Sequence, residues 1–184
     1  MPCISRMKDT SVYLTAADRA KALKLFSDNH LSLTDRIITR LRTEVNGPGS
    51  PPGAVFLTVS AQVSYKGLPI FNSGIAYYFE NGVYTGKNGF PLDVAAIDTT
   101  PHQSLKQVYD LFSAKLSKDT VAINKGINNA CITARYGLYY IPNADNTVYT
   151  LRKAWFVTPS GLSAPQAFIW DDDGSFMSYY SKIF

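Results

Sequence analysis

The feature that most constrains the fold is an order of patterns that occurs twice along the chain. In each half, one stretch with apolar residues at helical spacing precedes several stretches in which apolar and polar residues alternate. The helical stretches cover residues 15–28 and 104–116. A repeat of about 90 residues is too long for a solenoid unit. The sequence therefore predicts an α+β protein made of two similar subdomains, each with a helix laid on an antiparallel sheet.

In the first half, Thr15 is a candidate N-cap for the helix because its hydroxyl can accept a hydrogen bond from the first turn. The segment 33–45 is predicted as a strand that places Arg36, Arg40 and Arg42 together on a solvated face. Residues 46–53 are rich in glycine and proline and are predicted as a loop.

Strands are then predicted at 54–64 and 75–79, and Asn81-Gly82 is the strongest short hairpin signal in the chain. Residues 91–101 form a connector to the second half. There, Ser104 and Gln107 stand at capping-box spacing ahead of the second helix. Further strands are predicted at the positions 130–141, 148–158, 166–171 and 176–183.

Composition narrows the class of protein. Of the 184 residues, 46% are hydrophobic and 17% are charged, so the body of the chain is not predicted to be disordered. No apolar run is long enough for a membrane span. The net charge of +4 arises within residues 1–42, while the remainder is neutral. Because a nucleic-acid-binding protein usually carries a denser basic face, no nucleic acid partner is predicted.

The two cysteines are too far apart in the chain for a disulfide framework or a zinc site of ordinary spacing. Cys131 lies in an apolar stretch and is predicted to be a small buried hydrophobic residue. Cys3 stands close to the start of the chain, where bacterial lipoproteins carry their acylated cysteine. Cys3 is therefore a candidate lipidation site, and an ordinary cysteine in an N-terminal tail is the alternative. A lipid on Cys3 would be the only membrane contact.

The string Ser64-Tyr65-Lys66-Gly67-Leu68-Pro69-Ile70-Phe71 resembles the Tyr-Lys-Gly-(Ile/Val)-Pro-Val-Phe motif of the propeptide domains of fungalysin and thermolysin proteases. As in those propeptides, a strand precedes it, and a strand and an Asn-Gly turn follow. Residues 151–157 and 168–174 are similar in pattern to the alanine-tryptophan strand and the closing Asp-x-x-Gly hairpin of PepSY domains. The resemblance covers roughly residues 54–184.

This resemblance implies two cystatin-like (PepSY-like) subdomains in tandem. The predicted boundaries are an N-terminal tail at 1–13, subdomain 1 at 14–98 and subdomain 2 at 99–184. An edge strand is the alternative for residues 1–13. One departure is important, because no His-Glu-x-x-His motif and no protease follow. The module would be free-standing. The candidate binding residues, taken from the motifs and the aromatic positions, are Tyr65, Gly67, Pro69, Phe71, Tyr77, Trp155 and Trp170.

These residues also have a structural interpretation, in which Gly67 and Pro69 shape a bend and both tryptophans pack in a core. No catalytic residues, metal ligands or cofactor are predicted. The run Asp171-Asp172-Asp173 is interpreted as a solvated turn, with a calcium site as the alternative.

The resemblance therefore implies a non-enzymatic, extracytoplasmic module of bacterial type, in the periplasm, on the outer membrane or secreted. Its partner would be a protein or peptide, such as a protease supplied in trans that it inhibits. The partner would be bound at a sheet edge, or the face of a sheet would cover the partner's cleft. One alternative is a surface lipoprotein that binds a small molecule or a glycan. Another is an enzyme built on a cystatin-like scaffold.

Overall fold

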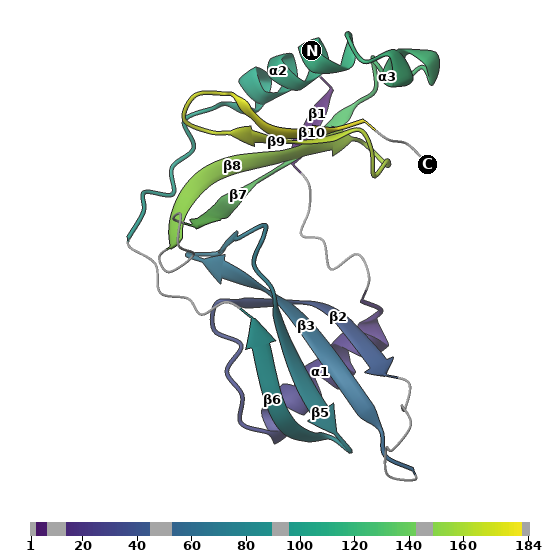
Figure 1. Cartoon of the computed structure of the whole chain (residues 1–184), viewed down its shortest axis with the longest axis vertical. Coiled ribbons are helices and arrows are strands. Elements are labelled where there is room, and N and C mark those ends of the chain that lie inside the picture. The colour runs from purple at the N-terminus through teal and green to yellow at the C-terminus, as the bar shows by residue number, and fades with distance from the viewer. Residues whose placement is uncertain (1–2, 7–13, 45–52, 90–95, 143–148, 182–184) are drawn as a thin grey trace. The chain divides into compact units, whose positions relative to one another are not determined.

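A computed structural model describes residues 3–6, 14–44, 53–89, 96–142 and 149–181 (Figure 1). Most of the predicted loop at 46–53, part of the connector at 91–101 and residues 7–13 of the predicted tail lie outside these ranges. The chain divides into two compact units. The inserted unit comprises Asp9–Val94, and the discontinuous unit comprises Met1–Lys8 together with Ala95–Phe184. The division between the halves falls at 94/95, whereas the sequence placed it at 98/99.

The inserted unit is one helix on an antiparallel sheet (Figure 1). The sheet order is β2-β3-β5-β6, and the short β4 pairs with β3. Its elements are α1 (Ala16–Asp28), β2 (Arg36–Glu44), β3 (Phe56–Tyr65), β4 (Leu68–Pro69), β5 (Ile75–Glu80) and β6 (Val83–Gly89).

Local chemistry accounts for the start of α1 and for its position on the sheet. The Thr15 hydroxyl accepts a hydrogen bond from the Asp18 backbone N–H at 3.0 Å, which confirms the predicted N-cap. Phe26 of α1 is buried and packs against Tyr77 of β5, with ring centroids 4.7 Å apart. Alternate residues of β3 are buried beneath it, as the period-two pattern predicted.

The β5–β6 hairpin turns at Asn81 and Gly82, whose φ angles of 51° and 84° fit the predicted two-residue turn. Asn29, which ends α1, connects the helix to this hairpin. Its side-chain amide donates to the carbonyl oxygens of Leu25 and Gly82, both at 2.8 Å, and its Oδ1 accepts from the Tyr84 N–H at 2.8 Å. One polar side chain thus fixes the end of α1 over the last strand of the sheet.

Strand β2 departs from the predicted alternation. A β-bulge between Ile38 and Arg40 shifts its register against β3. After the bulge, Arg40 lies opposite Ser60 and is exposed, whereas before it Arg36 lies opposite the buried Val63. The prediction that Arg36 shares a solvated face with Arg40 and Arg42 is therefore wrong, because the extra residue turns Arg36 toward the face that carries α1.

The discontinuous unit contains the sheet β1-β7-β8-β9-β10, which α2 covers on one face (Figure 1). Strand β1 pairs with β7 in parallel, and the other neighbours are antiparallel. Its elements are β1 (Ile4–Arg6), α2 (Leu105–Leu116), α3 (Thr120–Asn124), β7 (Ile132–Pro142), β8 (Tyr149–Pro159), β9 (Gln166–Trp170) and β10 (Phe176–Tyr180).

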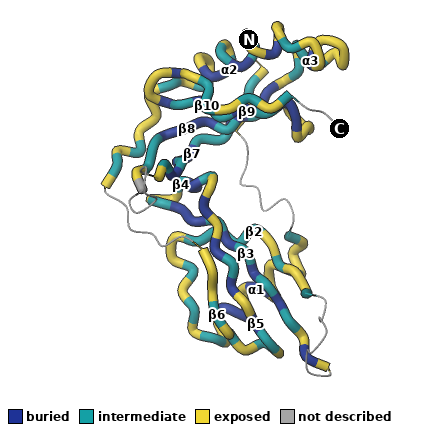
Figure 2. Tube along the Cα trace, in the orientation of Figure 1, coloured by how far each residue is buried: buried dark blue, intermediate teal, exposed yellow. Residues whose placement is uncertain are grey.

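The core of this unit lies between α2 and the sheet, where Figure 2 shows the buried segments. The predicted capping box is present: the Gln107 N–H donates to the Ser104 hydroxyl, and the Ser104 N–H donates to the Gln107 side chain. The buried cluster combines one face of α2 and one residue of α3 with alternate residues of three strands, namely Val108, Phe112, Leu116, Ala122, Ile132, Ala134, Trp155, Val157, Ala167 and Ile169.

The mixed α+β class with two separate sheets is as predicted. The segment Ile4–Arg6 is an edge strand of the second sheet, which agrees with one of the two alternatives for residues 1–13, a tail or an edge strand. One element differs from the expectation. The short helix α3 was not predicted, and Asp119 caps it by accepting hydrogen bonds from the N–H groups of Val121 and Ala122.

Candidate functional site

The wide spacing of the two cysteines predicted no disulfide framework, but the structure joins them in one disulfide, Cys3–Cys131, across a sequence separation of 128 residues. Cys131 is exposed, so the prediction that it is a buried hydrophobic residue is wrong. The bond fixes β1 to the start of β7, where the Ile132 N–H also donates to the Cys3 carbonyl oxygen at 2.8 Å. Because both cysteines belong to the discontinuous unit, the disulfide closes a chain loop that contains the whole inserted unit.

This bond bears on the predicted lipidation of Cys3. A sulfur atom in a disulfide cannot also carry a thioether-linked lipid, so the two modifications exclude each other at Cys3. In the protein as the structure describes it, the Cys3 sulfur is already bonded to Cys131. A disulfide is also compatible with an oxidising, extracytoplasmic compartment.

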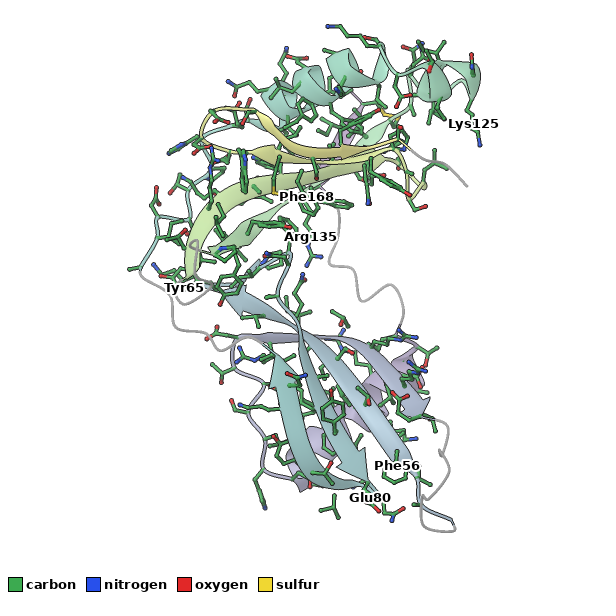
Figure 3. All side chains as sticks on the ribbon, in the orientation of Figure 1. Phe56, Tyr65, Glu80, Lys125, Arg135 and Phe168 are labelled. Atoms are coloured by element: carbon green, nitrogen blue, oxygen red, sulfur yellow. A yellow bond between two sulfur atoms is a disulfide. The ribbon has the colours of Figure 1, made fainter. Side chains whose placement is uncertain are left out.

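The propeptide-like string forms the β3–β4 turn of the inserted unit. Lys66 and Gly67 have φ angles of 49° and 78° and make a two-residue turn between the paired residues Tyr65 and Leu68. The Lys66 ammonium lies 5.3 Å from the Tyr65 ring centroid. Figure 3 labels Tyr65 at the end of the long strand. Pro69 is buried, so these residues shape the turn.

Polar side chains hold the chain that follows this turn. The Ser73 hydroxyl is buried, donates to the Ile70 carbonyl oxygen at 2.7 Å and accepts from the Val63 N–H at 3.2 Å. Gln62 donates to the same Ile70 carbonyl oxygen at 3.2 Å. Phe71 is half-buried in this segment. The local structure therefore explains why small and polar residues surround the string.

Two of the predicted binding residues are core residues. Tyr77 is 5% exposed and packs under α1, and Trp155 is 2% exposed and packs under α2. The indole N–H of Trp155 donates to the Asp171 carboxylate at 2.8 Å. Neither ring faces solvent, so the core interpretation holds for Trp155, and Tyr77, which was predicted only as a binding residue, is also a core residue.

Trp170 lies on the opposite face of the second sheet, away from α2. It pairs with Ala154 in the register of β8 and β9, next to the helix-facing pair Trp155 and Ile169. The Arg152 guanidinium stacks on the Trp170 ring at 4.3 Å, and Tyr139 meets the ring edge-on. Figure 3 labels Phe168, which belongs to the same face. The indole face is therefore already covered by a cation from its own sheet.

The three carboxylates of the run Asp171-Asp172-Asp173 lie in two different environments, one buried and one exposed. Asp171 is fully buried and accepts hydrogen bonds from the N–H groups of His102 and Gln103 at 2.7 and 3.0 Å, in addition to the Trp155 bond. The interpretation of Asp171 as solvated is wrong, because its carboxylate binds the segment that leads into α2. The Lys153 ammonium, 3.7 Å away, offsets its charge.

Asp172 and Asp173 are exposed and pair with Arg152. The guanidinium contacts Asp172 through two nitrogens at 2.7 and 2.9 Å and Asp173 at 3.0 Å. These hydrogen bonds with Arg152 lower the pKa of the Asp172 carboxyl. Within the described residues, no group of three or more histidine, cysteine, aspartate or glutamate side chains could hold a metal ion.

The arrangement that best suits a ligand is a groove between α2 and β10, of about 440 Å³. Strand β10 is the last strand in the described order of its sheet, so one of its edges faces away from β9. The groove has an apolar floor and a charged rim, lined by Asp110, Leu111, Ala114, Lys115, Lys118 and Phe176.

The rim of the groove is cationic. Asp110 is paired with Lys106 at 2.6 Å. Among the described residues neither Lys115 nor Lys118 forms an ion pair, and the Lys115 ammonium lies 5.9 Å from the Phe176 ring centroid. The groove thus offers an apolar surface beside Lys118 and beside Lys115, whose charge also acts on the nearby Asp119.

A hydrogen bond connects β10 to the residue that follows Lys118 of the groove. The Tyr179 hydroxyl donates to Asp119 at 2.6 Å, which joins β10 to the cap of α3. Burial and this hydrogen bond raise the pKa of Tyr179. Gly174 has a φ of 70°, and a Cβ at this position would lie 3.1 Å from Leu111. Glycine therefore allows the hairpin to approach α2.

Sequence reasoning missed this groove, although one signal pointed to it. Leu111 lies outside the apolar stripe of α2 formed by Val108 and Phe112, and an apolar residue beside a buried stripe extends the apolar surface toward one side. That β10 would lie along that side follows from the sheet order, which the sequence does not show.

Comparison with models of known protein families gave no match, and comparison with curated proteins gave no significant match. The resemblance to propeptide and PepSY domains therefore stays a prediction. None of the helices in the described ranges is long and apolar enough to cross a membrane.

Proposed function

We propose that this protein is a non-enzymatic, extracytoplasmic binding module of two cystatin-like, PepSY-like subdomains that captures an extended segment of a protein or peptide. The observation that carries the proposal is the groove of about 440 Å³ between α2 and β10, beside the edge of a sheet. Strand addition at such an edge provides backbone hydrogen bonds, and a neighbouring pocket receives alternate side chains.

The register predicts which side chains enter the groove. Phe176 lies opposite Ile169 and therefore on the face of the sheet that carries α2. Residues of a strand added beside β10 would alternate between the two faces of the sheet, so every second side chain would point into the groove. The segment captured is thus expected to carry an apolar side chain at one such position.

The positive charge of the groove's rim predicts an acidic residue close to the apolar side chain of the captured segment. Lys115 and Lys118 line the groove, and neither forms a salt bridge with an acid among the described residues. An aspartate or glutamate two positions from the apolar residue would lie on the same face and approach these ammonium groups. The proposed partner is therefore an extended, acidic segment with at least one apolar side chain.

A phage-displayed library of random peptides, selected on the full chain, tests this proposal. We expect enriched peptides to combine β-prone and acidic residues, and to bind at least tenfold more weakly to Ala114→Arg, which fills the groove. Ala114 is exposed on α2, and Ala20 is exposed on α1, so Ala20→Arg is the matched control and should bind normally.

Two results would overturn strand capture at β10. One is a failure to enrich any peptide, or enriched peptides that bind Ala114→Arg as tightly as the original chain. The other is a concentration-dependent dimer that Ala114→Arg abolishes, since a second copy of the chain would then be the occupant.

The inhibitor version of this proposal has its own test. If the segment captured belongs to a secreted metalloprotease, the full chain at micromolar concentration should slow hydrolysis by thermolysin, and Ala114→Arg should not. An unchanged rate would remove the inhibitor role while leaving peptide capture to the library experiment. Mass spectrometry of the native protein separately distinguishes a Cys3–Cys131 disulfide from an acyl chain on Cys3.

A further inference from the structure

A second cavity, of about 250 Å³, lies within the inserted unit. It is bounded by the loop between α1 and β2, by the start of β2 and by strands β5 and β6. The residues that line it are Leu31, Ser32, Thr34, Arg36, Tyr77, Tyr84 and Lys87. The cavity opens on the face of the sheet that carries α1, because Tyr77, which packs against α1, lies opposite Lys87 in the strand register.

Arg36 reaches this cavity because of the bulge in β2, which turns it away from the solvated face of Arg40. Its guanidinium has an incomplete set of partners. One nitrogen donates to the Asp35 carbonyl oxygen at 2.9 Å, but the Nε is buried and has no hydrogen-bond partner. A buried donor without an acceptor costs free energy, more so when the group is charged.

Lys87 adds a second cation to the same wall. Among the described residues neither Lys87 nor Arg36 forms an ion pair, and no aspartate or glutamate lines the cavity. The other polar groups are hydroxyls, and Ser32 and Thr34 are joined by a 2.9 Å hydrogen bond. Two unmatched cations and several hydroxyls form a surface that favours an anion over a neutral or cationic ligand.

We infer that this cavity is a binding site for one carboxylate group carried on a short aliphatic chain. A guanidinium presents parallel N–H donors that match the two oxygens of a carboxylate, and a small rotation would bring the unpaired donor to the ligand. The cavity is smaller than the roughly 300–1,000 Å³ typical of sites for drug-sized ligands, which limits the ligand to a few atoms. Leu31 and the tyrosine rings provide the apolar surface for that short chain.

The carboxylate can come from two sources, a free carboxylic acid or an acidic side chain of a bound peptide. This inference does not rest on the groove between α2 and β10, because the two cavities belong to different units of the chain. The failure of one proposal therefore leaves the other standing.

Titration of the isotope-labelled full chain with glutarate, followed by amide NMR, tests the site. We expect shifts centred on residues 31–36, Tyr84 and Lys87, with a dissociation constant in the millimolar range, as suits a single charge-assisted contact. Arg36→Gln should weaken binding at least tenfold, and Lys87→Gln several-fold. Arg40→Gln removes the same charge from the same strand at an exposed position, so it should leave binding unchanged.

Three further arms complete the test. The monoamide of glutaric acid should bind through its remaining carboxylate, whereas the diamide should not bind. A peptide with an internal glutamate that shifts the same amides more strongly than glutarate identifies a peptide side chain as the source, and the reverse order identifies a free acid. Inorganic phosphate binding as tightly as glutarate, equal binding to Arg36→Gln and Arg40→Gln, or no shifts at all would overturn the inference. Lys87→Gln keeps the test valid if Arg36→Gln does not fold, because Lys87 is exposed.

Discussion

Removal of the Cys3–Cys131 disulfide should destabilise one unit of the protein and leave the other almost unchanged. The bond closes a loop with a sequence separation of 128 residues. By chain entropy alone, a loop of this length corresponds to about 5 kcal/mol of stabilisation. If the inserted unit stays folded while the discontinuous unit unfolds, the flexible part of the loop falls to roughly 45 residues, and the stabilisation falls to about 4 kcal/mol. The two limits are close because loop entropy grows only slowly with length.

The sequence provides a selective assay for this prediction. Both tryptophans, Trp155 and Trp170, lie in the discontinuous unit, and the chain contains two tryptophans in total. Tryptophan fluorescence during urea unfolding therefore reports on that unit alone. With a slope of about 1.5 kcal/mol/M for a unit of this size, the Cys3→Ser variant should unfold at a midpoint lower by about 3 M urea. Cys131→Ser and the double variant should give the same midpoint.

Two measurements could refute this reasoning. Two free thiols in the native protein, detected by alkylation without reductant, would contradict the bond itself. A fall of less than about 1 kcal/mol in the tryptophan-monitored free energy of unfolding would contradict the entropic argument, because strain would then cancel the constraint. Cys3 and Cys131 are both exposed, so the serine variants leave no core cavity that could account for the loss.

Three further predictions concern the acidic hairpin. Asp171→Asn should lower the tryptophan-monitored stability by about 2–4 kcal/mol, because the amide places a donor against buried N–H groups. Gly174→Ala should cost about 1–2 kcal/mol, since the left-handed backbone strains an L-residue and the new Cβ meets Leu111. The same substitution should also weaken the binding of a peptide in the groove between α2 and β10. Because Arg152 lowers the pKa of Asp172 in the folded protein, this carboxyl contributes stability above its unfolded pKa near 3.8 and loses it as the pH falls through the lower folded value. Urea midpoints of the original chain and Asp172→Asn should therefore converge in acid, and a constant difference would contradict this.

The elements that follow from local chemistry were predictable from the sequence. The Thr15 cap, the Ser104 capping box and the Asn81-Gly82 turn each depend on residues within four positions of one another. Long alternating strands such as β3 were equally clear, because the period of two persists over ten residues. Most missed features depend on contacts between residues far apart in the chain.

Two examples show why. The segment Ile4–Arg6 has no alternation long enough to decide between a tail and an edge strand, and its parallel pairing with Ile132–Ala134 is what makes it a strand. Asp171 was interpreted as solvated because aspartate favours turns. Its burial depends on His102 and Gln103, which lie almost seventy residues earlier in the chain. Neither of these long-range contacts can be recognised from a single sequence.

The two candidate sites also depend on contacts between residues far apart in the chain. They occupy corresponding positions in the two halves of the internal repeat. Each proposed site lies on the helix-bearing face of its sheet and is lined by the last strand of its unit, β6 in one and β10 in the other. Each is also cationic, through Arg36 and Lys87 in the inserted unit and Lys115 and Lys118 in the discontinuous unit. In both units, a helix that lies over an antiparallel sheet leaves space beside the final strand, and lysine or arginine lines that space. The net charge of +4 is therefore a poor guide to these sites. Lys115 and Lys118, which line the groove between α2 and β10, belong to the part of the chain that is neutral overall. The proposed preference for acidic ligands therefore arises from where the cations gather within each unit.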